Sequence, residues 1–200
     1  MGSPGDGFGG SIVVVVPALN PDGLVANTRQ KAKVDLNRNL ITTNWGQATD
    51  IAEKELGHPY YGGPAPGSEP ETQWLMQLMA HYCPQGILSL HTPYAVVNWD
   101  GPVSSGGVSP AQQWAEALSA VTGYPVTDDI GYPTPGSLGT YAGVERHIPV
   151  ITLELAEAFN QPNPSHALQG LWQTHQSVIQ TSLAQPFLHA PIGQQQGLLA

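Results

Sequence analysis

The run Ile12–Val16 constrains the fold of this chain more than any other segment. All five of its residues are apolar and β-branched, so neither face of the run is polar. A strand with one face in water alternates polar and apolar residues, whereas a continuous run is typical of a strand buried on both faces, as in a parallel sheet covered by helices. We therefore expect a buried strand over residues 11–17, inside a layered domain.

A loop with two arginines leaves this expected strand. Arg29 and Arg38 are two of only six basic residues in the chain, and Asn37 lies beside the second. Functional loops lie at such strand ends, and a planar guanidinium is well suited to holding a carboxylate or an oxyanion. Exposed arginines are otherwise solvated or form weak surface pairs. The loop is therefore a candidate anion-binding site, with plain surface charges as the alternative.

The rest of the chain alternates strand, loop and helix, which is the pattern of a layered α/β domain. Apolar residues at helical spacing predict helices over residues 70–82, 110–121 and 165–183. Apolar runs predict strands over residues 86–91, 94–99 and 148–155. An apolar stripe from Leu168 to Leu183 is expected to close the last helix over the sheet. We expect one domain over residues 1–190 and a frayed tail over residues 191–200.

Charge and hydropathy exclude some classes of partner. A net charge of −9 with six basic residues gives no basic surface for nucleic acid or for an anionic membrane. No apolar run approaches the roughly 20 residues of a membrane-spanning helix. Residues 1–10 have neither the basic start nor the apolar centre of an export signal. We therefore expect no nucleic-acid or membrane partner and favour a cytoplasmic location, whereas the oligomeric state has no signal in the sequence.

Four segments in a fixed order resemble the zinc metallocarboxypeptidase family of carboxypeptidase A type. They are the loop with Asn20-Pro-Asp-Gly23 and Asp35-Leu-Asn-Arg-Asn39, the helix start at residues 62–72, and the strand ends Ser89-Leu-His-Thr92 and Ile151-Thr-Leu-Glu154. Any one of these motifs alone would be a weak signal. Residues 97–102 and 132–141 are most similar to the bacterial branch that contains murein peptide amidases. The resemblance implies a three-layer α/β/α sandwich with a mixed, mostly parallel sheet.

The resemblance also implies a zinc-dependent hydrolase that cleaves a peptide or murein-peptide amide next to a free carboxylate. His91 matches a zinc ligand, Glu154 the general base that takes a proton from zinc-bound water, and Arg29 the group that stabilises the oxyanion. From residue chemistry alone, His91 is more often a structural histidine. Glu154 lies in an apolar run, where a carboxylate is costly unless it is paired or functional. Glu157 is the rival candidate for the base.

The same resemblance assigns the substrate-binding residues. Asn37 and Arg38 would hold the terminal carboxylate of the substrate, Arg38 with two parallel hydrogen bonds. Tyr132 would be the mobile tyrosine that caps the substrate, with Tyr141 as its rival. Leu138 would lie near the floor of the substrate pocket, and this apolar residue weighs against a pocket built to pair with a basic side chain.

One part of the family pattern does not occur in these 200 residues. The family binds zinc through an H-x-x-E pair ahead of the loop and one later histidine, whereas the first histidine of this chain is His58. A catalytic zinc takes three protein ligands, so His91 alone is not expected to hold it tightly. We expect the chain to be the C-terminal part of a longer zinc enzyme, inactive on its own, whose export signal could lie in the missing part. The alternatives are a non-catalytic peptide-binding relative that lacks the zinc site and an N-acyl amino acid deacylase of the same fold.

Overall fold

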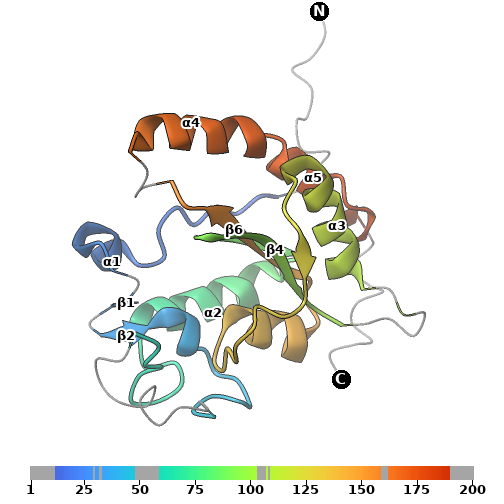
Figure 1. The fold of residues 1–200 in the computed structure, drawn as a ribbon. Coiled ribbons are helices and arrows are strands. Elements are labelled where there is room, and N and C mark those ends of the chain that lie inside the picture. Colours follow the sequence, from blue (N-terminus) through green and yellow to red (C-terminus); the bar gives the residue numbers. More distant parts are fainter. Residues whose placement is uncertain are drawn as a thin grey trace, which may run out of the picture.

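The computed structural model describes residues 12–28, 30, 31, 33–47, 59–102, 107, 109–158 and 162–189. Its centre is a four-stranded sheet with the strand order β3-β6-β4-β5 (Figure 1). The strands are β3 (Ile87–His91), β4 (Tyr94–Asp100), β5 (Val126–Thr127) and β6 (Val150–Ala156). β3 lies parallel to β6 and β5 parallel to β4, while β4 is antiparallel to β6. The predicted mixed, mostly parallel sheet is confirmed.

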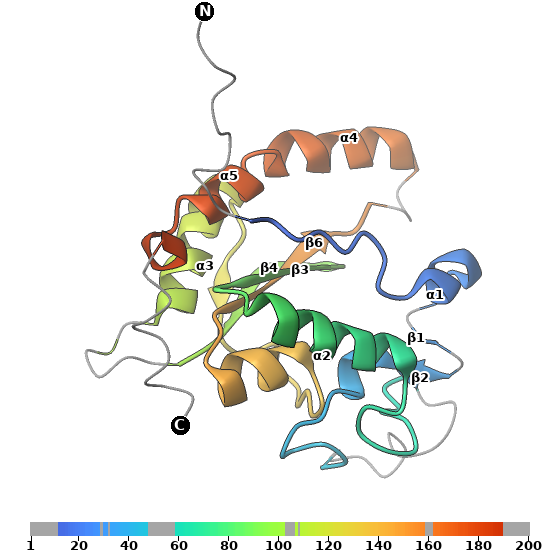
Figure 2. The same ribbon diagram turned by 180° about the vertical axis from the view of Figure 1, so that it is seen from behind.

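Helical elements cover both faces of the sheet and complete three layers (Figure 2). On one face, α3 (Pro110–Thr122) and α5 (Val178–Leu183) pack against Val97, Ile151 and Leu153. On the other face, α2 (Pro70–Tyr82) and the π-helical segment η3 (Gly139–Val144) pack against Ile87 and Val150. Successive strand residues point to opposite faces. The even-numbered residues of β4 and β6 therefore share the second face with the odd-numbered residues of β3.

Local signals set most helix boundaries. Proline occupies the first turn of α2, α3 and α4 (Pro164–His175), where its missing N–H has no intrahelical partner to lose. Gly123 ends α3 in the left-handed region, at φ 74°. The shorter elements are α1 (Pro21–Ala26), β1 (Gln30–Lys31), β2 (Val34–Asp35), η1 (Leu36–Arg38) and η4 (Pro186–His189). No helix within the described residues is both long and apolar enough to cross a membrane.

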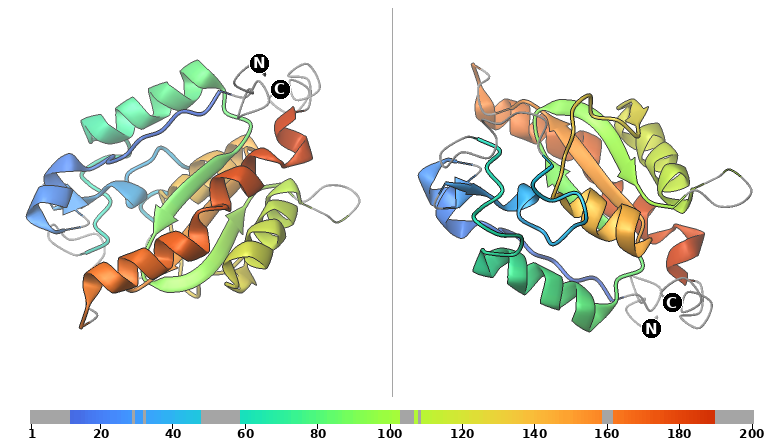
Figure 3. Two further views of the ribbon diagram at one scale, coloured as in Figure 1. Left: turned by 90° about the horizontal axis from the view of Figure 1, so that it is seen from above. Right: turned by 90° about the horizontal axis from the view of Figure 1, so that it is seen from below.

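The prediction of a buried strand over residues 11–17 is wrong for the part that the structure describes. Residues 12–16 form no strand, and Ile12 is 83% exposed. An apolar run becomes a strand only beside a partner that takes up its backbone hydrogen bonds, and none of the described strands pairs with it. The segment instead runs along α2 (Figure 3), where Val15, Val16 and Trp74 line an apolar groove.

The prediction of a single closing helix over residues 165–183 is also wrong. The chain forms α4 and α5, which are separated at residues 176 and 177. α4 buries none of its side chains and leaves Trp172 69% exposed. In α5, Val178 is buried and Ser182 accepts a hydrogen bond of 3.1 Å from Trp114 Nε1. Helical spacing predicted the helices correctly, but only α5 buries side chains, whereas α4 contacts the rest of the protein through half-buried residues such as His175, whose ring lies 5.0 Å from that of Tyr124. Residues 190–200 lie outside the described residues, so the domain boundary and the tail stay predictions.

Candidate active site

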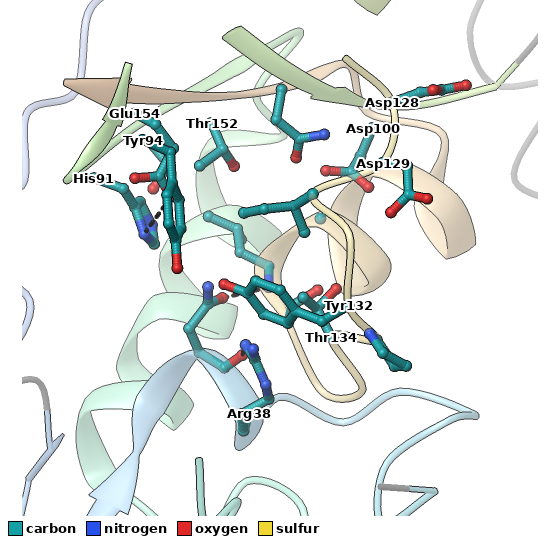
Figure 4. A pocket seen from close by; sticks show the side chains of 18 of the residues that line it. Arg38, His91, Tyr94, Asp100, Asp128, Asp129, Tyr132, Thr134, Thr152 and Glu154 are labelled. Carbon is teal, nitrogen blue, oxygen red and sulfur yellow. Dashed lines mark hydrogen bonds and ion pairs between the residues drawn. The ribbon is translucent and has the colours of Figure 1, made fainter. Parts of the chain in front are cut away.

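A cavity of about 280 Å³ opens over the second face of the sheet, beside the ends of β3 and β6 (Figure 4). It collects side chains from distant parts of the sequence. Those predicted as site residues and found in its wall are Asn37, Arg38, His91, Tyr132, Leu138 and Glu154. Arg29 lies outside the described residues. The loops and strand ends singled out from the sequence therefore meet in one place, although the role of each residue stays a prediction.

His91 and Glu154 face each other across neighbouring strands. They are partners in the parallel register of β3 and β6, and the distance from His91 Nδ1 to Glu154 Oε1 is 3.8 Å. Glu154 is only 3% exposed, whereas His91 is half-buried. A carboxylate at the cavity wall beside an imidazole is well placed to accept a proton. Glu157 lies beyond the end of β6 and outside the wall of this cavity.

Asn37 and Arg38 come from η1, a single helical turn whose start is capped by Asp35. The Asp35 carboxylate accepts a hydrogen bond of 3.0 Å from the backbone N–H of Asn37. The Arg38 guanidinium donates to the Asn37 carbonyl at 2.8 Å and lies 5.2 Å from the centre of the Tyr60 ring. These contacts hold a nearly buried cation at the cavity, where it can pair with an anion.

Asn37 also joins η1 to the segment that carries Tyr132 and Leu138. Its side-chain oxygen accepts a hydrogen bond of 2.8 Å from the backbone N–H of Leu138. Gly136 packs so tightly on this loop that a Cβ there would lie 2.3 Å from the carbonyl oxygen of Arg38, and its φ is 74°. Only glycine meets both conditions. The two segments are therefore fixed to each other.

The two candidate tyrosines occupy different environments. Tyr132 lines the cavity and stacks on Tyr60, with 6.1 Å between the ring centres. Burial raises the pKa of Tyr132, and Tyr94 raises it further through its charge and a hydrogen bond. Tyr141 is buried in η3 beneath the Arg146 guanidinium, which lies 3.4 Å from its ring centre. Tyr132 is therefore open to the cavity and Tyr141 is packed in the core, while the capping role of Tyr132 stays a prediction.

Sequence reasoning missed the polar floor of the cavity. Ser89, Thr152 and Asn98 lie in one row across β3, β6 and β4, and Asp100 lies two residues beyond Asn98. All of them lie on the second face of the sheet. The available signal was the polar residues at every second position of otherwise apolar strands, which marks one face as not belonging to the core.

Asp100 is the most unusual of these floor residues. Its carboxylate lies against η3, so close that a Cβ on Gly139 would be 2.3 Å from Asp100 Oδ2. Burial raises the pKa of Asp100 to about 6. Among the described residues, no hydrogen-bond donor or cation pairs with this carboxylate. The carboxylate therefore bears the desolvation cost of burial without a compensating partner.

Comparison with known proteins identifies the family of the chain. The model of the zinc carboxypeptidase family matches residues 11–177, and the chain belongs to that family. Murein peptide amidase A of Escherichia coli (strain K12) is 35% identical over 133 residues, which cover 64% of this chain and 51% of the amidase. The protein of the same name from Vibrio campbellii (strain ATCC BAA-1116) is 34% identical over 147 residues, covering 70% of this chain and 55% of that protein. The chain thus spans about half the length of these curated relatives.

Solved structures confirm the fold. The crystal structure of murein-tripeptide amidase MpaA from Escherichia coli O157 matches with a TM-score of 0.57 and 27% identity, covering 86% of this chain and 66% of that chain. Carboxypeptidase A from Helicoverpa armigera matches with a TM-score of 0.63 and covers 86% of this chain and 51% of its own, but its 18% identity shows the fold alone. The predicted family and its murein peptide amidase-like branch are confirmed.

The described residues meet the requirements of a zinc site only in part. His91 offers a half-buried imidazole at the cavity, which is a normal zinc ligand. No group of three or more His, Cys, Asp or Glu side chains able to hold a metal ion occurs in the part of the chain that the structure describes. A catalytic zinc takes three protein ligands. The described residues supply one of these ligands and do not complete the site.

Proposed function

We propose that the chain belongs to a zinc-dependent metallocarboxypeptidase or amidohydrolase that cleaves a peptide or murein-peptide amide next to a free carboxylate. The proposal is based on one observation: Arg38 lines the same cavity as the His91 and Glu154 pair. A cation can hold the carboxylate of the substrate while a buried carboxylate lies beside the reacting amide. The names of the relatives favour a murein peptide as the substrate.

Each residue then has a chemical task. The Arg38 guanidinium holds the terminal carboxylate, and Tyr60 beneath it limits its movement. Glu154 takes a proton from the water that attacks the amide carbonyl carbon, and returns it to the leaving nitrogen when the C–N bond breaks. Tyr132 covers the bound residue from the side of the Arg38 loop. Zinc, when bound, supplies a Lewis acid, and Arg29 stays a candidate for stabilising the oxyanion.

A second candidate function is peptide binding without cleavage. It is favoured by the lack of a three-ligand metal cluster among the described residues. In this case Arg38 and the cavity floor would still select a free carboxyl terminus. In a preparation that holds stoichiometric zinc, release of an amino acid from N-acetyl-alanyl-norleucine would argue against this function, while binding without turnover would support it.

The binding step can be tested on the 200-residue chain. Isothermal titration with N-acetyl-alanyl-norleucine and with its carboxyl-terminal amide measures the contribution of the carboxylate. Arg38→Ala should cost about 2–5 kcal/mol of binding free energy, the range for truncating one partner of a desolvated charge pair. Amidation should cost a similar amount in the wild-type chain. Both changes together should cost much less than their sum, because they remove the same interaction.

Lys33→Ala provides the matched control for this titration. Lys33 is an exposed cation in the same loop as Arg38, so its removal should leave the affinity nearly unchanged. Additive losses from Arg38→Ala and amidation would show that Arg38 does not contact the carboxylate, and would contradict the proposal.

A further inference from the structure

The Tyr60 ring lies outside the cavity wall, yet it neighbours two of the side chains that line the cavity. The centre of the ring is 5.2 Å from Cζ of Arg38 and 6.1 Å from the centre of the Tyr132 ring, whose plane is inclined to it by 25°. Arg38 and Tyr132 come from separate segments and lie on the same side of the cavity (Figure 4). Tyr60 therefore meets both side chains that hold the bound residue in the proposed function.

The backbone next to Tyr60 is held against the turn that carries Arg38. The Tyr61 carbonyl accepts a hydrogen bond of 2.8 Å from the backbone N–H of Asp35, the residue that caps η1. Gly62 lies so close to the same turn that a Cβ there would be 2.5 Å from the Arg38 carbonyl oxygen. Because the two residues after Tyr60 are packed on η1, the Tyr60 ring and the Arg38 guanidinium share one framework.

Asn39, the residue after Arg38, extends this framework. Its side chain is fully buried, and its amide nitrogen donates hydrogen bonds of 2.7 Å to the Gly62 carbonyl and 3.1 Å to the Ala65 carbonyl. Its side-chain oxygen accepts a hydrogen bond of 3.1 Å from the backbone N–H of Glu69. The loop that begins at Tyr60 is thus bound to η1 along its length.

The position of Tyr132 depends more on its side chain. Its neighbours Gly131 and Pro133 are exposed, and a Cβ on Gly131 would have no other atom within 4 Å. The close approach of this segment to η1 lies further along the chain, at Gly136. Stacked rings whose centres are roughly 4.5–7 Å apart attract each other beyond the effect of their burial. The Tyr60 ring is therefore well placed to hold the ring of Tyr132.

Charge links the same three side chains. A guanidinium is attracted to the face of an aromatic ring, and Arg38 lies over the Tyr60 ring in this way. Arg38 also acts on Tyr132: burial raises the pKa of Tyr132, whereas the positive charge of Arg38 acts in the opposite direction. A carboxylate bound to Arg38 would offset part of this charge, and both rings would experience the change.

We propose that Tyr60 is a positioning residue that couples the binding of a terminal carboxylate at Arg38 to the placement of Tyr132 over the bound residue. The inference rests on the proposed function, because it takes Arg38 and Tyr132 to meet the substrate. It adds a dependence of one of these side chains on the other. Loss of the Tyr60 ring should remove this dependence without removing a group of the cavity wall.

The test is a cycle of titrations of the 200-residue chain with N-acetyl-alanyl-norleucine and its carboxyl-terminal amide. Tyr132→Ala and amidation should each weaken binding. In the wild-type background, their combined effect on Kd should be smaller than the product of the two separate effects by roughly 3-fold to 10-fold, as expected for one stacked aromatic pair. In a Tyr60→Leu background the two effects should simply multiply, because leucine keeps apolar bulk but has no aromatic face.

Two control variants separate the ring from general packing. Tyr60→Phe keeps the aromatic face and should keep the coupling. Tyr82→Leu makes the same change as Tyr60→Leu at an exposed tyrosine at the end of α2, and should leave both affinities and the coupling unchanged. Thermal unfolding reports on folding in every variant. If Tyr60→Leu fails to fold, the wild-type cycle still decides, because coupling there supports the inference and independent effects overturn it.

The outcomes also separate this inference from the function on which it rests. If the amide binds the wild-type chain as tightly as the free acid, the proposed function fails and the inference fails with it. If the carboxylate contributes to binding but acts independently of Tyr132, the role of Tyr60 is overturned and the proposed function stands. Coupling that persists in Tyr60→Leu, or that is lost in Tyr60→Phe, overturns the role of the ring in the same way.

Discussion

The two faces of β6 carry opposite chemistry in a single strand. Ile151 and Leu153 point toward α3 and α5 and are at most 1% exposed. Thr152 and Glu154, which alternate with them, line the cavity on the other side. The apolar face holds the layers together, while the polar face bears the desolvation cost of a buried carboxylate. Stability and chemistry are thus separated by one residue step along the strand, and a substitution should affect one and spare the other.

The largest expected effect lies on the polar face. In a preparation that holds the family's zinc, Glu154→Gln should lower kcat by about 100-fold to 10,000-fold, the usual contribution of a general base. kcat/KM should fall equally, since the interaction acts in the transition state. Steady-state kinetics with the zinc content measured in parallel would check this. Glu157→Gln should retain most activity, and the reverse ranking would move the base to Glu157.

The next effect lies on the apolar face. Leu153→Ala removes fully buried methyl groups from the core and should lower the free energy of unfolding by about 2–5 kcal/mol. Thr152→Val, its neighbour on the polar face, should change it by roughly 1 kcal/mol or less. Urea unfolding followed by tryptophan fluorescence measures both. Equal losses would show that the two faces are not energetically separate.

Asp100 should show a smaller effect with an unusual pH dependence. Its pKa of about 6 in the folded protein exceeds the ordinary value of 3.8. Between these pH values the folded state binds more protons than the unfolded state, so the free energy of unfolding falls as pH rises. Asp100→Asn should remove this fall in the free energy of unfolding, because asparagine has no carboxyl group to titrate. The variant should be about 1–2 kcal/mol more stable than wild type at pH 7.5, which is less than the roughly 3 kcal/mol that corresponds to the full shift in pKa. Near pH 3.5 the variant and the wild type should be equally stable.

Unfolding curves of both proteins over this pH range provide the check. A destabilised Asp100→Asn at pH 7.5 would mean that the folded protein pairs the carboxylate, which would contradict this prediction.

The smallest effect should come from α4. Trp172→Ala changes a side chain that is 69% exposed, and should shift the free energy of unfolding by no more than about 0.5 kcal/mol. Val178→Ala in α5 should cost more, because Val178 is buried against the α3 layer. The same unfolding assay compares them. A large loss from Trp172→Ala would show that the Trp172 side chain is packed in solution.

What the sequence could predict depended on whether a local signal was sufficient. Apolar residues at helical spacing placed the helix at residues 70–82, and the apolar run at residues 148–155 placed β6. Ile12–Val16 has an equally strong signal, yet a strand also needs a hydrogen-bonding partner, which no pattern in the run itself specifies. The same reason separates α4 from α5, because spacing along a helix does not say which turns meet a neighbouring layer.

The same distinction applies to the site residues. Motif resemblance found residues whose identity is distinctive, such as His91 and Glu154, and the structure brings them together in the cavity. Asn98 and Asp100 were missed because their significance lies in the register of β4 against β6, which sets them on one floor with Thr152. Register follows from tertiary pairing. A polar residue at every second position of an apolar strand is the only trace of it in the sequence.

The contact between η1 and the segment at residues 132–139 has an evolutionary consequence. Asn37 accepts the Leu138 N–H, and Gly136 admits no side chain because the Arg38 carbonyl lies beneath it. Neither segment can change its sequence at these contacts without a matching change in the other. Related enzymes that acquire new substrates should therefore vary at the floor, in β4 and β6, while the two joined segments are inherited as a pair.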